Sequence, residues 1–163
     1  MRGTVVAVCI SPDAGIPKYA SSTPVCVGRF GLEGDYHNRE MRRSFSKPGT
    51  FKPNTDRHIT LVAYEVIEDL NRELGLTLGP GSLGENITTQ GLGDLSDIPD
   101  GAEILIGDKI LLRVVEQNQP CKNLAPLHRL LVKKIHGRRG LLCAIEEGVG
   151  VVISSDTTIE VCT

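Results

Sequence analysis

The stretch EILIGDKILLRVVE, residues 103–116, decides the fold. It contains two short runs of isoleucine, leucine and valine, residue types that favour strands. Between the runs lies Ile106-Gly107-Asp108, and Gly and Asp tolerate the positive φ angles of a tight turn. The stretch therefore predicts two strands, residues 103–105 and 109–116, joined by a hairpin turn.

Similar runs recur along the chain between Gly, Pro and Asp residues, which is typical of a mainly β domain. The first run, residues 4–10, is expected to be a buried inner strand. The remaining expected strands are residues 24–27, 59–62, 85–88, 141–146, 149–154 and 158–161.

Two segments have the apolar spacing of a helix instead. The first is residues 66–74, which Gly75 is placed to end, and the second is opened by Pro126 and followed by Gly137. Residues 39–55 have no periodicity and contain two prolines and one glycine. They are therefore predicted to form a long loop or lid.

The composition, with 40 % hydrophobic and 23 % charged residues over 163 positions, predicts one folded domain spanning residues 1–163. No stretch approaches the ~18 apolar residues of a membrane-spanning helix, so we expect a cytoplasmic protein without a membrane partner. A net charge of −2 gives no overall attraction for nucleic acid, and none is expected as a partner.

Positive charge is concentrated in two segments. Residues 117–145 contain six Lys or Arg and no Asp or Glu, and residues 39–57 contain six Lys or Arg against Glu40 and Asp56. The second segment overlaps the predicted lid. We expect this lid to close over a bound ligand.

The five cysteines are odd in number, scattered and never spaced as CxxC, which argues against a disulfide framework and a zinc ribbon. Four of them lie in apolar, strand-like surroundings, where a buried Cys acts as a small hydrophobe: Cys9, Cys26, Cys143 and Cys162. Cys121 instead lies in the polar segment QNQPCKN, residues 117–123. Nearby cations favour thiolate, which is both a nucleophile and a soft metal ligand, although a surface Cys without a task remains the alternative.

Two further segments are candidates for a site. GLEGDYH, residues 31–37, places Asp35 and His37 beside glycines, but a Gly-Asp turn with a surface His would look the same. GPGSLGENITT, residues 79–89, lets backbone N–H groups approach an anion, but a tight connection from helix to strand explains its glycines almost as well. The four histidines have no zinc spacing. A cysteine hydrolase pairing Cys121 with His37 or His58 stays open.

Taken in order, these segments resemble the MOSC domain, named for the C-terminal part of molybdenum cofactor sulfurases. The resemblance covers nearly the whole chain and rests on GLEGD (31–35), RHITL (57–61), GENIT (84–88), Gly91-Leu92, IGD (106–108), Pro120-Cys121 and GRRG (137–140). It implies a mainly β fold with a MOSC-like β-barrel core and a few peripheral helices. It also implies molybdenum-molybdopterin as the cofactor.

The resemblance further implies roles for individual residues. Cys121 would accept sulfur or ligate molybdenum, and Arg138 or Arg139 would hold the pterin phosphate. The residues that would shape the cofactor pocket are Arg57, Glu85, Asn86 and Thr88, and Asp35 and His37 match the motif's position.

The chain also departs from larger members of this family, because it has no pyridoxal-phosphate desulfurase domain. Pyridoxal phosphate is therefore not expected. The first hypothesis is a cofactor-binding or sulfur-carrier protein whose partners are molybdoenzymes or cofactor-biosynthesis proteins. The alternative is a small molybdenum-dependent reductase of N-hydroxylated compounds, which would need an external electron donor.

Overall fold

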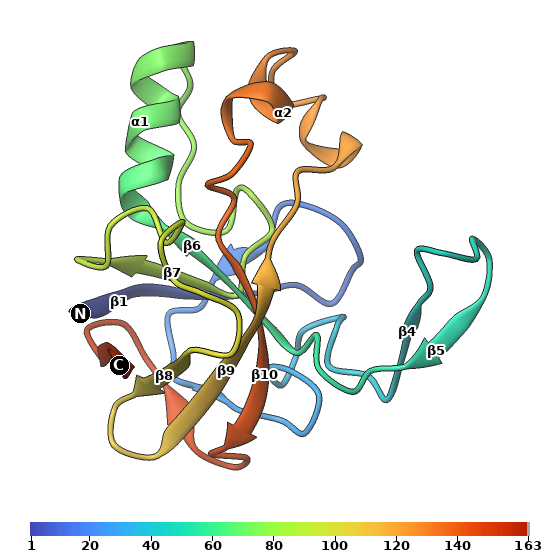
Figure 1. Cartoon of the computed structure of the whole chain (residues 1–163), viewed down its shortest axis with the longest axis vertical. Coiled ribbons are helices and arrows are strands. Elements are labelled where there is room, and N and C mark those ends of the chain that lie inside the picture. The colour runs from blue at the N-terminus through green and yellow to red at the C-terminus, as the bar shows by residue number, and fades with distance from the viewer. Residues whose placement is uncertain (163) are drawn as a thin grey trace.

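A closed β-barrel of seven strands forms the centre of the computed structural model, which describes residues 1–162 (Figure 1). Around the barrel the order is β1-β7-β6-β10-β9-β8-β12, and β12 returns to β1. All neighbouring pairs are antiparallel except β6 and β7. The bounds are β1 (Arg2–Ile10), β6 (Ile59–Ala63), β7 (Ile87–Gln90), β8 (Glu103–Ile106), β9 (Ile110–Gln117), β10 (Leu141–Glu147) and β12 (Thr158–Cys162).

Strand β1 closes the barrel because its first residues pair with β12 on one side and β7 on the other. Thr4 lies opposite Thr158 of β12 and Gln90 of β7. The backbones approach so closely here that a Cβ atom on Gly3 would lie 2.2 Å from the carbonyl oxygen of Gln90. Only glycine fits at this position. The end of β1 also pairs with the short β2 (Tyr19–Ala20).

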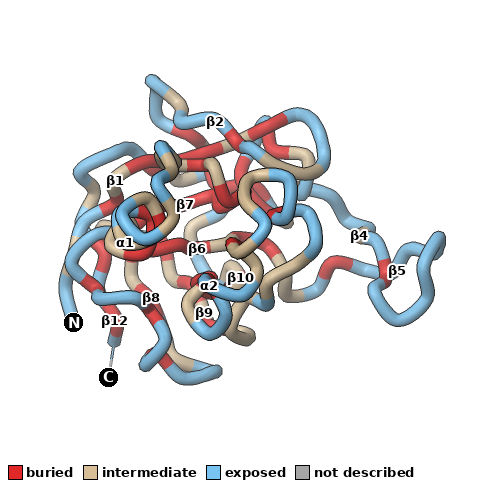
Figure 2. Tube along the Cα trace, turned by 90° about the horizontal axis from the view of Figure 1, so that it is seen from above, coloured by how far each residue is buried: buried red, intermediate tan, exposed pale blue. Residues whose placement is uncertain are grey.

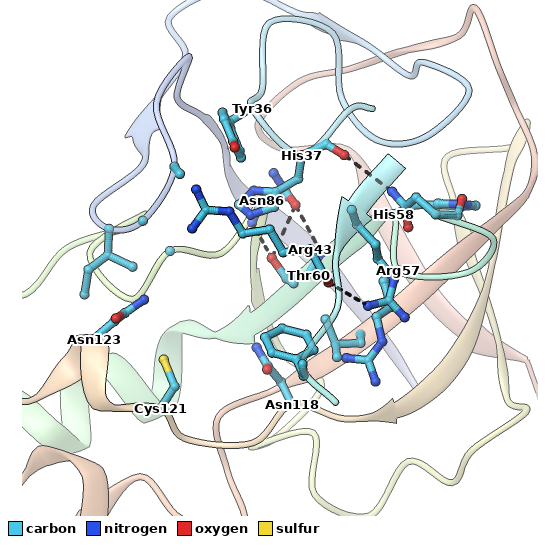
Figure 3. Close-up of a pocket in the computed structure, with 18 of the residues that line it drawn as sticks. Tyr36, His37, Arg43, Arg57, His58, Thr60, Asn86, Asn118, Cys121 and Asn123 are labelled. Carbon is cyan, nitrogen blue, oxygen red and sulfur yellow. Dashed lines mark hydrogen bonds between the residues drawn. The ribbon is translucent and has the colours of Figure 1, made fainter. Parts of the chain in front are cut away.

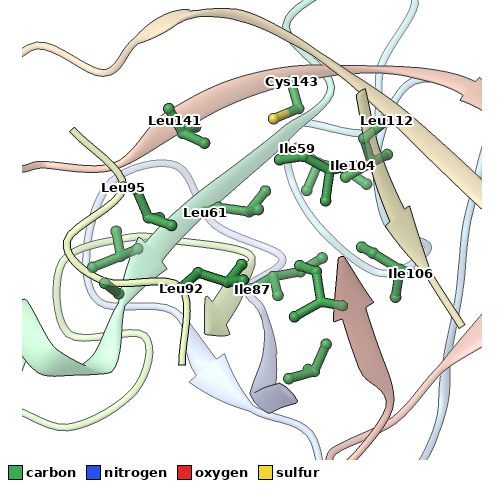
Figure 4. Packing of buried hydrophobic residues seen from close by; sticks show 14 of the residues in the cluster. Ile59, Leu61, Ile87, Leu92, Leu95, Ile104, Ile106, Leu112, Leu141 and Cys143 are labelled. Carbon is green, nitrogen blue, oxygen red and sulfur yellow. The ribbon is translucent and has the colours of Figure 1, made fainter. Parts of the chain in front are cut away.

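The barrel interior is filled by aliphatic side chains from every part of the sheet (Figure 4). Helix α1 (Tyr64–Leu74) follows β6 directly and packs Val66, Ile67 and Leu70 against this core. Gly75 ends the helix with φ of 65°, as the sequence predicted. Figure 2 shows that buried residues follow the barrel strands, whereas the outlying loops are mostly exposed.

The mainly β fold and the hairpin of β8 and β9 are confirmed. Three predicted strands are shifted or shortened, and the one expected over residues 24–27 has only two residues, Val25–Cys26. The strand expected from residue 85 begins at Ile87, and Asn86 just before it is bonded to Thr60 through both its backbone N–H and its side-chain oxygen. The strand expected over residues 149–154 contains only β11 (Val152–Ile153), which pairs with β3 (Val25–Cys26).

The long second helix was a wrong prediction. A 3₁₀ turn, η1 (Lys122–Leu124), precedes Pro126, and α2 covers only Leu131–Lys134. The intervening residues form turns, in which the ring nitrogen Nδ1 of His128 accepts a hydrogen bond from the backbone N–H of Leu130. Leu124, Leu131 and Ile135 are still buried. The apolar spacing therefore marked residues that reach the core, while the backbone N–H of Leu130 bonds a side chain in place of a helical carbonyl.

The predicted loop at residues 39–55 is a β-hairpin in part. Strands β4 (Met41–Arg43) and β5 (Phe51–Pro53) pair with each other and project away from the barrel (Figure 1). Each strand has three residues, too few to show the alternation by which strands are recognised in a sequence. Within residues 1–162, no helix is long and apolar enough to cross a membrane.

The burial of β1 predicts a contrast between two neighbouring valines. The side chain of Val8 is buried, with 2 % of the residue exposed, whereas Val6 is only half-buried. Val8→Asp should unfold the protein, because an unpaired buried charge costs roughly 3 to 5 kcal/mol against a total stability of about 5 to 15 kcal/mol. Val6→Asp should lower the melting temperature less. Circular dichroism during heating compares the two, and wild-type melting of Val8→Asp would contradict the burial of β1.

Candidate functional site

A cavity of about 650 Å³ lies beside one end of the barrel, where several separate segments meet (Figure 3). Its wall includes residues that follow β1, the β4–β5 hairpin, the start of β6, Asn86 before β7, and the chain that leaves β9. The cavity has the size of a small-molecule or cofactor site. It brings together segments that are far apart in the sequence.

Cys121 lines this cavity and is half-buried. The chain that carries it is fixed on leaving β9, because the N–H of Asn118 donates to the carbonyl of Gly140 at 2.8 Å. The guanidinium of Arg139 then donates to the carbonyl of Gln119 at 2.7 Å. Immediately after Cys121 the 3₁₀ turn begins. The chain is therefore fixed by hydrogen bonds before Cys121 and by the 3₁₀ turn after it.

The other thiols lie elsewhere. Burial raises the pKa of Cys9 and of Cys143 to about 12, so both remain neutral thiols at physiological pH. Cys26 is half-buried and Cys162 is exposed, so the expectation that all four are buried is wrong for Cys162, which lies on the outer face of β12. Of the cysteines in the described chain, Cys121 alone lines the cavity.

The cavity wall is strongly cationic. Among the described residues that line it, Glu116 is the one acidic side chain, and it pairs with Arg57. Six lining side chains are cationic: Lys18, Arg39, Arg42, Arg43, Arg57 and Arg139. Burial, and then the neighbouring charge of Arg57, lower the pKa of Arg42. Such crowding of cations favours an anionic ligand.

Two of these guanidinium groups also have hydrogen-bonding capacity left over. The Nε atoms of Arg42 and Arg139 are both buried and have no hydrogen-bond partner within residues 1–162. Arg139 as a whole is 8 % exposed. Because a buried donor without an acceptor costs free energy, both atoms are suited to a ligand with acceptor oxygens.

A buried ion pair forms one corner of the site. The ammonium of Lys18 lies 2.8 Å from Oδ2 of Asp35 and 3.3 Å from Nδ1 of His37. Burial by itself raises the pKa of Asp35, but hydrogen bonding from His37, the charge and hydrogen bond of Lys18, and the N–H of Ser11 outweigh it. The pKa of Asp35 is therefore held well below its usual range.

The contacts with Lys18 and Asp35 fix the position of the His37 ring. Nδ1 lies 3.5 Å from Asp35 and closer, at 3.3 Å, to the Lys18 ammonium, which can only donate. Nδ1 is thus held between an ammonium and a carboxylate, and Nε2 makes no hydrogen bond to the described residues. Half of the His37 side chain is exposed, and the residue lines the cavity. The corner thus fixes the position of an imidazole at the cavity.

The cavity brings together five of the residues singled out from the sequence: His37, Arg57, Asn86, Cys121 and Arg139. Glu85 and Thr88 are not in its lining. Glu85 is 1 % exposed, and its Oε1 accepts hydrogen bonds from the N–H of Gly81 and the hydroxyl of Thr88. Their hydrogen bonds fix the turn at Gly81, so these two residues stabilise the chain next to the cavity and do not line it.

The two adjacent arginines point in different directions. Arg138 extends to helix α1, where its guanidinium lies 3.4 Å from Asp69 and 3.0 Å from Glu73. Arg139 reaches the cavity and the Cys121 segment. Gly140 follows with φ of 94°, and a Cβ atom there would lie 1.8 Å from the carbonyl of Leu61. Only glycine allows β10 to begin this close to β6 directly after Arg139.

Sequence reasoning missed several cationic residues of the wall. Arg39, Arg42 and Arg43 belong to the basic segment that was noticed, but a segment assigned to a loop gave no direction for its side chains. No motif or charge cluster in the sequence singled out Lys18, because it lies alone in the chain between β1 and β2. Its partner Asp35 is 17 residues away and was recognised only through its motif.

The hydrolase alternative finds little support in the geometry. His58 uses both ring nitrogens, since Nδ1 accepts from the N–H of Ile145 at 3.0 Å and Nε2 lies 3.1 Å from the carbonyl of Asn54. In the described part of the chain no hydrogen bond joins Cys121 to His37 or His58. A thiol without an adjacent base lacks the pairing that defines a cysteine hydrolase.

Comparison with protein families identifies the domain. The model of the MOSC domain matches residues 34–159, which include His37, Arg57, Asn86, Cys121 and Arg139. The chain belongs to the MOSC domain family. A curated MOSC-domain relative is the Bacillus subtilis (strain 168) protein named "Putative metal-sulfur cluster biosynthesis proteins YuaD", 24 % identical over 142 residues that cover 77 % of this chain and 73 % of YuaD.

Solved structures share the same fold. The crystal structure of YuaD from Bacillus subtilis superposes with a TM-score of 0.86 at 21 % identity, covering 99 % of this chain and 96 % of YuaD. YiiM from Geobacillus stearothermophilus has a TM-score of 0.74 at 22 % identity over 99 % of this MOSC domain and 75 % of YiiM. YiiM from Escherichia coli has a TM-score of 0.70 at 22 % identity, covering 100 % of this chain and 70 % of YiiM.

The Asp35–Lys18 pair predicts a specific dependence of stability on pH. Because the pKa of Asp35 is depressed by folding, its stabilisation is complete above the pKa of the unfolded chain, about 3.9. It should be lost as the pH falls through the lower folded value. Asp35→Asn should remove this component and destabilise the protein by roughly 3 to 5 kcal/mol at neutral pH, because Lys18 is left buried without a counter-charge.

Urea unfolding at a series of pH values measures this effect. Asp108→Asn, at an exposed position in the β8–β9 turn, is the matched control and should leave the stability profile unchanged. Equal stability of wild type and Asp35→Asn at neutral pH would contradict the assignment of a buried ion pair.

Proposed function

We propose that this MOSC domain binds the molybdenum-pterin cofactor, or carries its sulfur, through Cys121 and passes the cargo to a molybdoenzyme or a cofactor-biosynthesis protein. The observation that carries this proposal is a cavity wall with six cationic side chains and one thiol. A phosphorylated anion that also offers a soft atom matches both features of the wall.

The residues present fit such a group. Arg139 and Arg42 have buried Nε atoms without hydrogen-bond partners among the described residues, and Arg57 also lines the cavity. These guanidinium groups would hold the terminal phosphate, because their planar donors match phosphate oxygens in pairs. Cys121 would provide the thiolate ligand to molybdenum. When bound, the cofactor supplies redox chemistry that no side chain of the protein can provide.

Carrying sulfur needs only the thiol. The Cys121 thiolate would attack the outer sulfur of a persulfide donor, forming a Cys121 persulfide and releasing the donor as its thiolate. No net oxidation occurs in this exchange, since one S–S bond forms as another breaks. The name of the relative YuaD, which refers to metal-sulfur cluster biosynthesis, is consistent with a sulfur-handling role.

His37 favours a second candidate function, the reduction of N-hydroxylated compounds. Its Nε2 makes no hydrogen bond to the described residues, and Nδ1 is held between Lys18 and Asp35. Cleavage of an N–OH bond takes up two electrons and two protons and releases water. His37 would deliver one proton to the departing hydroxyl, while an external donor would supply the electrons through the bound cofactor.

The role of Cys121 predicts the behaviour of Cys121→Ser. Protein purified from a host that makes the cofactor should lose its molybdenum or persulfide, because a hydroxyl is a poor ligand for a soft metal and cannot accept sulfur. Phosphate-dependent binding of the pterin should remain measurable. Cys26→Ser, at a half-buried thiol outside the cavity, is the control.

Metal analysis measures bound molybdenum, persulfide labelling measures the sulfur on Cys121, and fluorescence measures bound pterin. Retention of molybdenum and persulfide by Cys121→Ser would overturn the role of Cys121. Reduction of a hydroxylamine by the loaded wild-type protein with an artificial electron donor would establish the reductase, and loading without turnover would establish the carrier.

The two arginines give a second prediction. Arg139→Ala should weaken cofactor binding by about 1.5 to 3 kcal/mol, the usual worth of a hydrogen bond to a charged group. Arg138→Ala should leave binding unchanged, because Arg138 is engaged with α1. Cofactor retention during dialysis compares them. If Arg138→Ala weakens retention as much as Arg139→Ala, the phosphate is held differently.

A further inference from the structure

The β4–β5 hairpin exposes large apolar side chains although it stands apart from the barrel sheet. Its strands pair with each other and, within residues 1–162, with no other strand. Both views of the chain show it standing away from the barrel (Figures 1 and 2). Three of its large apolar residues are nevertheless exposed: Met41 by 45 %, Phe45 by 79 % and Phe51 by 58 %. Exposed apolar side chains gathered on one projection mark an interaction surface.

The same segment is basic in a chain that is acidic overall. Residues 39–57 contain six Lys or Arg against Glu40 and Asp56, whereas the whole chain has 18 Lys or Arg and 20 Asp or Glu. Lys47 and Lys52 are exposed and lie outside the cavity lining. They make no ion pair with any described residue. Nothing in the described chain therefore uses their charge.

The hairpin is continuous with the site. Met41, Phe45 and Phe51 belong to the cavity wall that also contains Cys121. The guanidinium of Arg57 lies over the ring of Phe45, 5.7 Å from its centre. Whatever covers the exposed side of the hairpin therefore also meets the cavity wall.

We propose that the hairpin is the docking surface for a partner protein that presents an apolar patch ringed by Asp and Glu, and that exchanges cargo with the cavity. This inference rests on the proposed carrier function and names the kind of partner. Charge complementarity with Lys47 and Lys52 selects an acidic surface, while Phe45 and Phe51 provide the apolar contact.

A lipid surface fits the hairpin less well. Anionic headgroups could meet the lysines, but a lipid surface offers no cargo to exchange with the cavity that Phe45 and Phe51 also line. A protein partner can instead place its own acceptors over the wall.

The first step of the test is photo-crosslinking in cells. The full chain with a benzoylphenylalanine at position 45 should give an adduct with an acidic protein, and the same probe at exposed Val149 should not. The captured protein is then purified and titrated against the untagged full chain. We expect Kd to rise with salt, because the exposed charges are screened.

Paired charge reversals identify the surface. Lys47→Glu with Lys52→Glu should raise the Kd for the captured protein by about tenfold or more. The control, Lys109→Glu with Lys133→Glu, changes the net charge equally at exposed lysines outside the hairpin and should leave Kd unchanged. Phe45→Ser should also raise this Kd, whereas Val149→Ser should leave it unchanged.

The same variants separate docking from the proposed function. Lys47→Glu with Lys52→Glu should retain molybdenum or the Cys121 persulfide as wild type does, because neither lysine lines the cavity. If wild type itself carries neither molybdenum nor persulfide, the proposed function fails whatever the hairpin binds. If wild type is loaded and the Lys47, Lys52 and Phe45 variants bind the captured protein normally, the docking surface is overturned.

Two other results would also overturn it. An adduct at position 45 that consists of two copies of this chain would make the hairpin a self-association surface. Sedimentation of wild type with vesicles of phosphatidylcholine and phosphatidylserine, lost in the Phe45→Ser variant, would make it a membrane contact.

Discussion

The double pairing of β1 is the constraint on which the rest of this MOSC domain depends. At Thr4 one strand is bonded to β12 and β7, and the absence of a side chain at Gly3 lets the backbones meet. Closure removes the free edges of the barrel sheet and sets the order of its neighbours. Because β7, β6, β10 and β9 are adjacent in that order, Asn86, Arg57, Arg139 and the Cys121 segment meet at one cavity.

The cavity concentrates positive charge that the fold does not neutralise. Asp35 balances Lys18 and Glu116 pairs with Arg57, but the buried Nε atoms of Arg42 and Arg139 remain without acceptors within residues 1–162. Buried donors without partners and crowded guanidinium groups both reduce stability. An anionic ligand would relieve both effects.

Arg139 connects this electrostatic feature to the thiol. One of its nitrogens bonds the carbonyl of Gln119, two residues before Cys121, and its Nε is left for a ligand. The residue that would hold a phosphate thus also positions the chain that carries the sulfur. Its neighbour Arg138 instead ties the same turn to α1 through Asp69 and Glu73.

The sequence by itself determined the strand-rich character of the chain, the β8–β9 hairpin, helix α1 with its stop at Gly75, and Cys121 as the exceptional cysteine. These features depend on residues close together in the chain, whose spacing and turn-forming residue types can be recognised in the sequence. Only the tertiary structure decided which of two adjacent arginines enters the cavity, that Lys18 pairs with Asp35, and that Glu85 and Thr88 lie behind the wall. Residues 41–53 likewise became a hairpin only through pairing across a turn. Each of these outcomes depends on contacts between distant segments, and barrel closure sets those contacts.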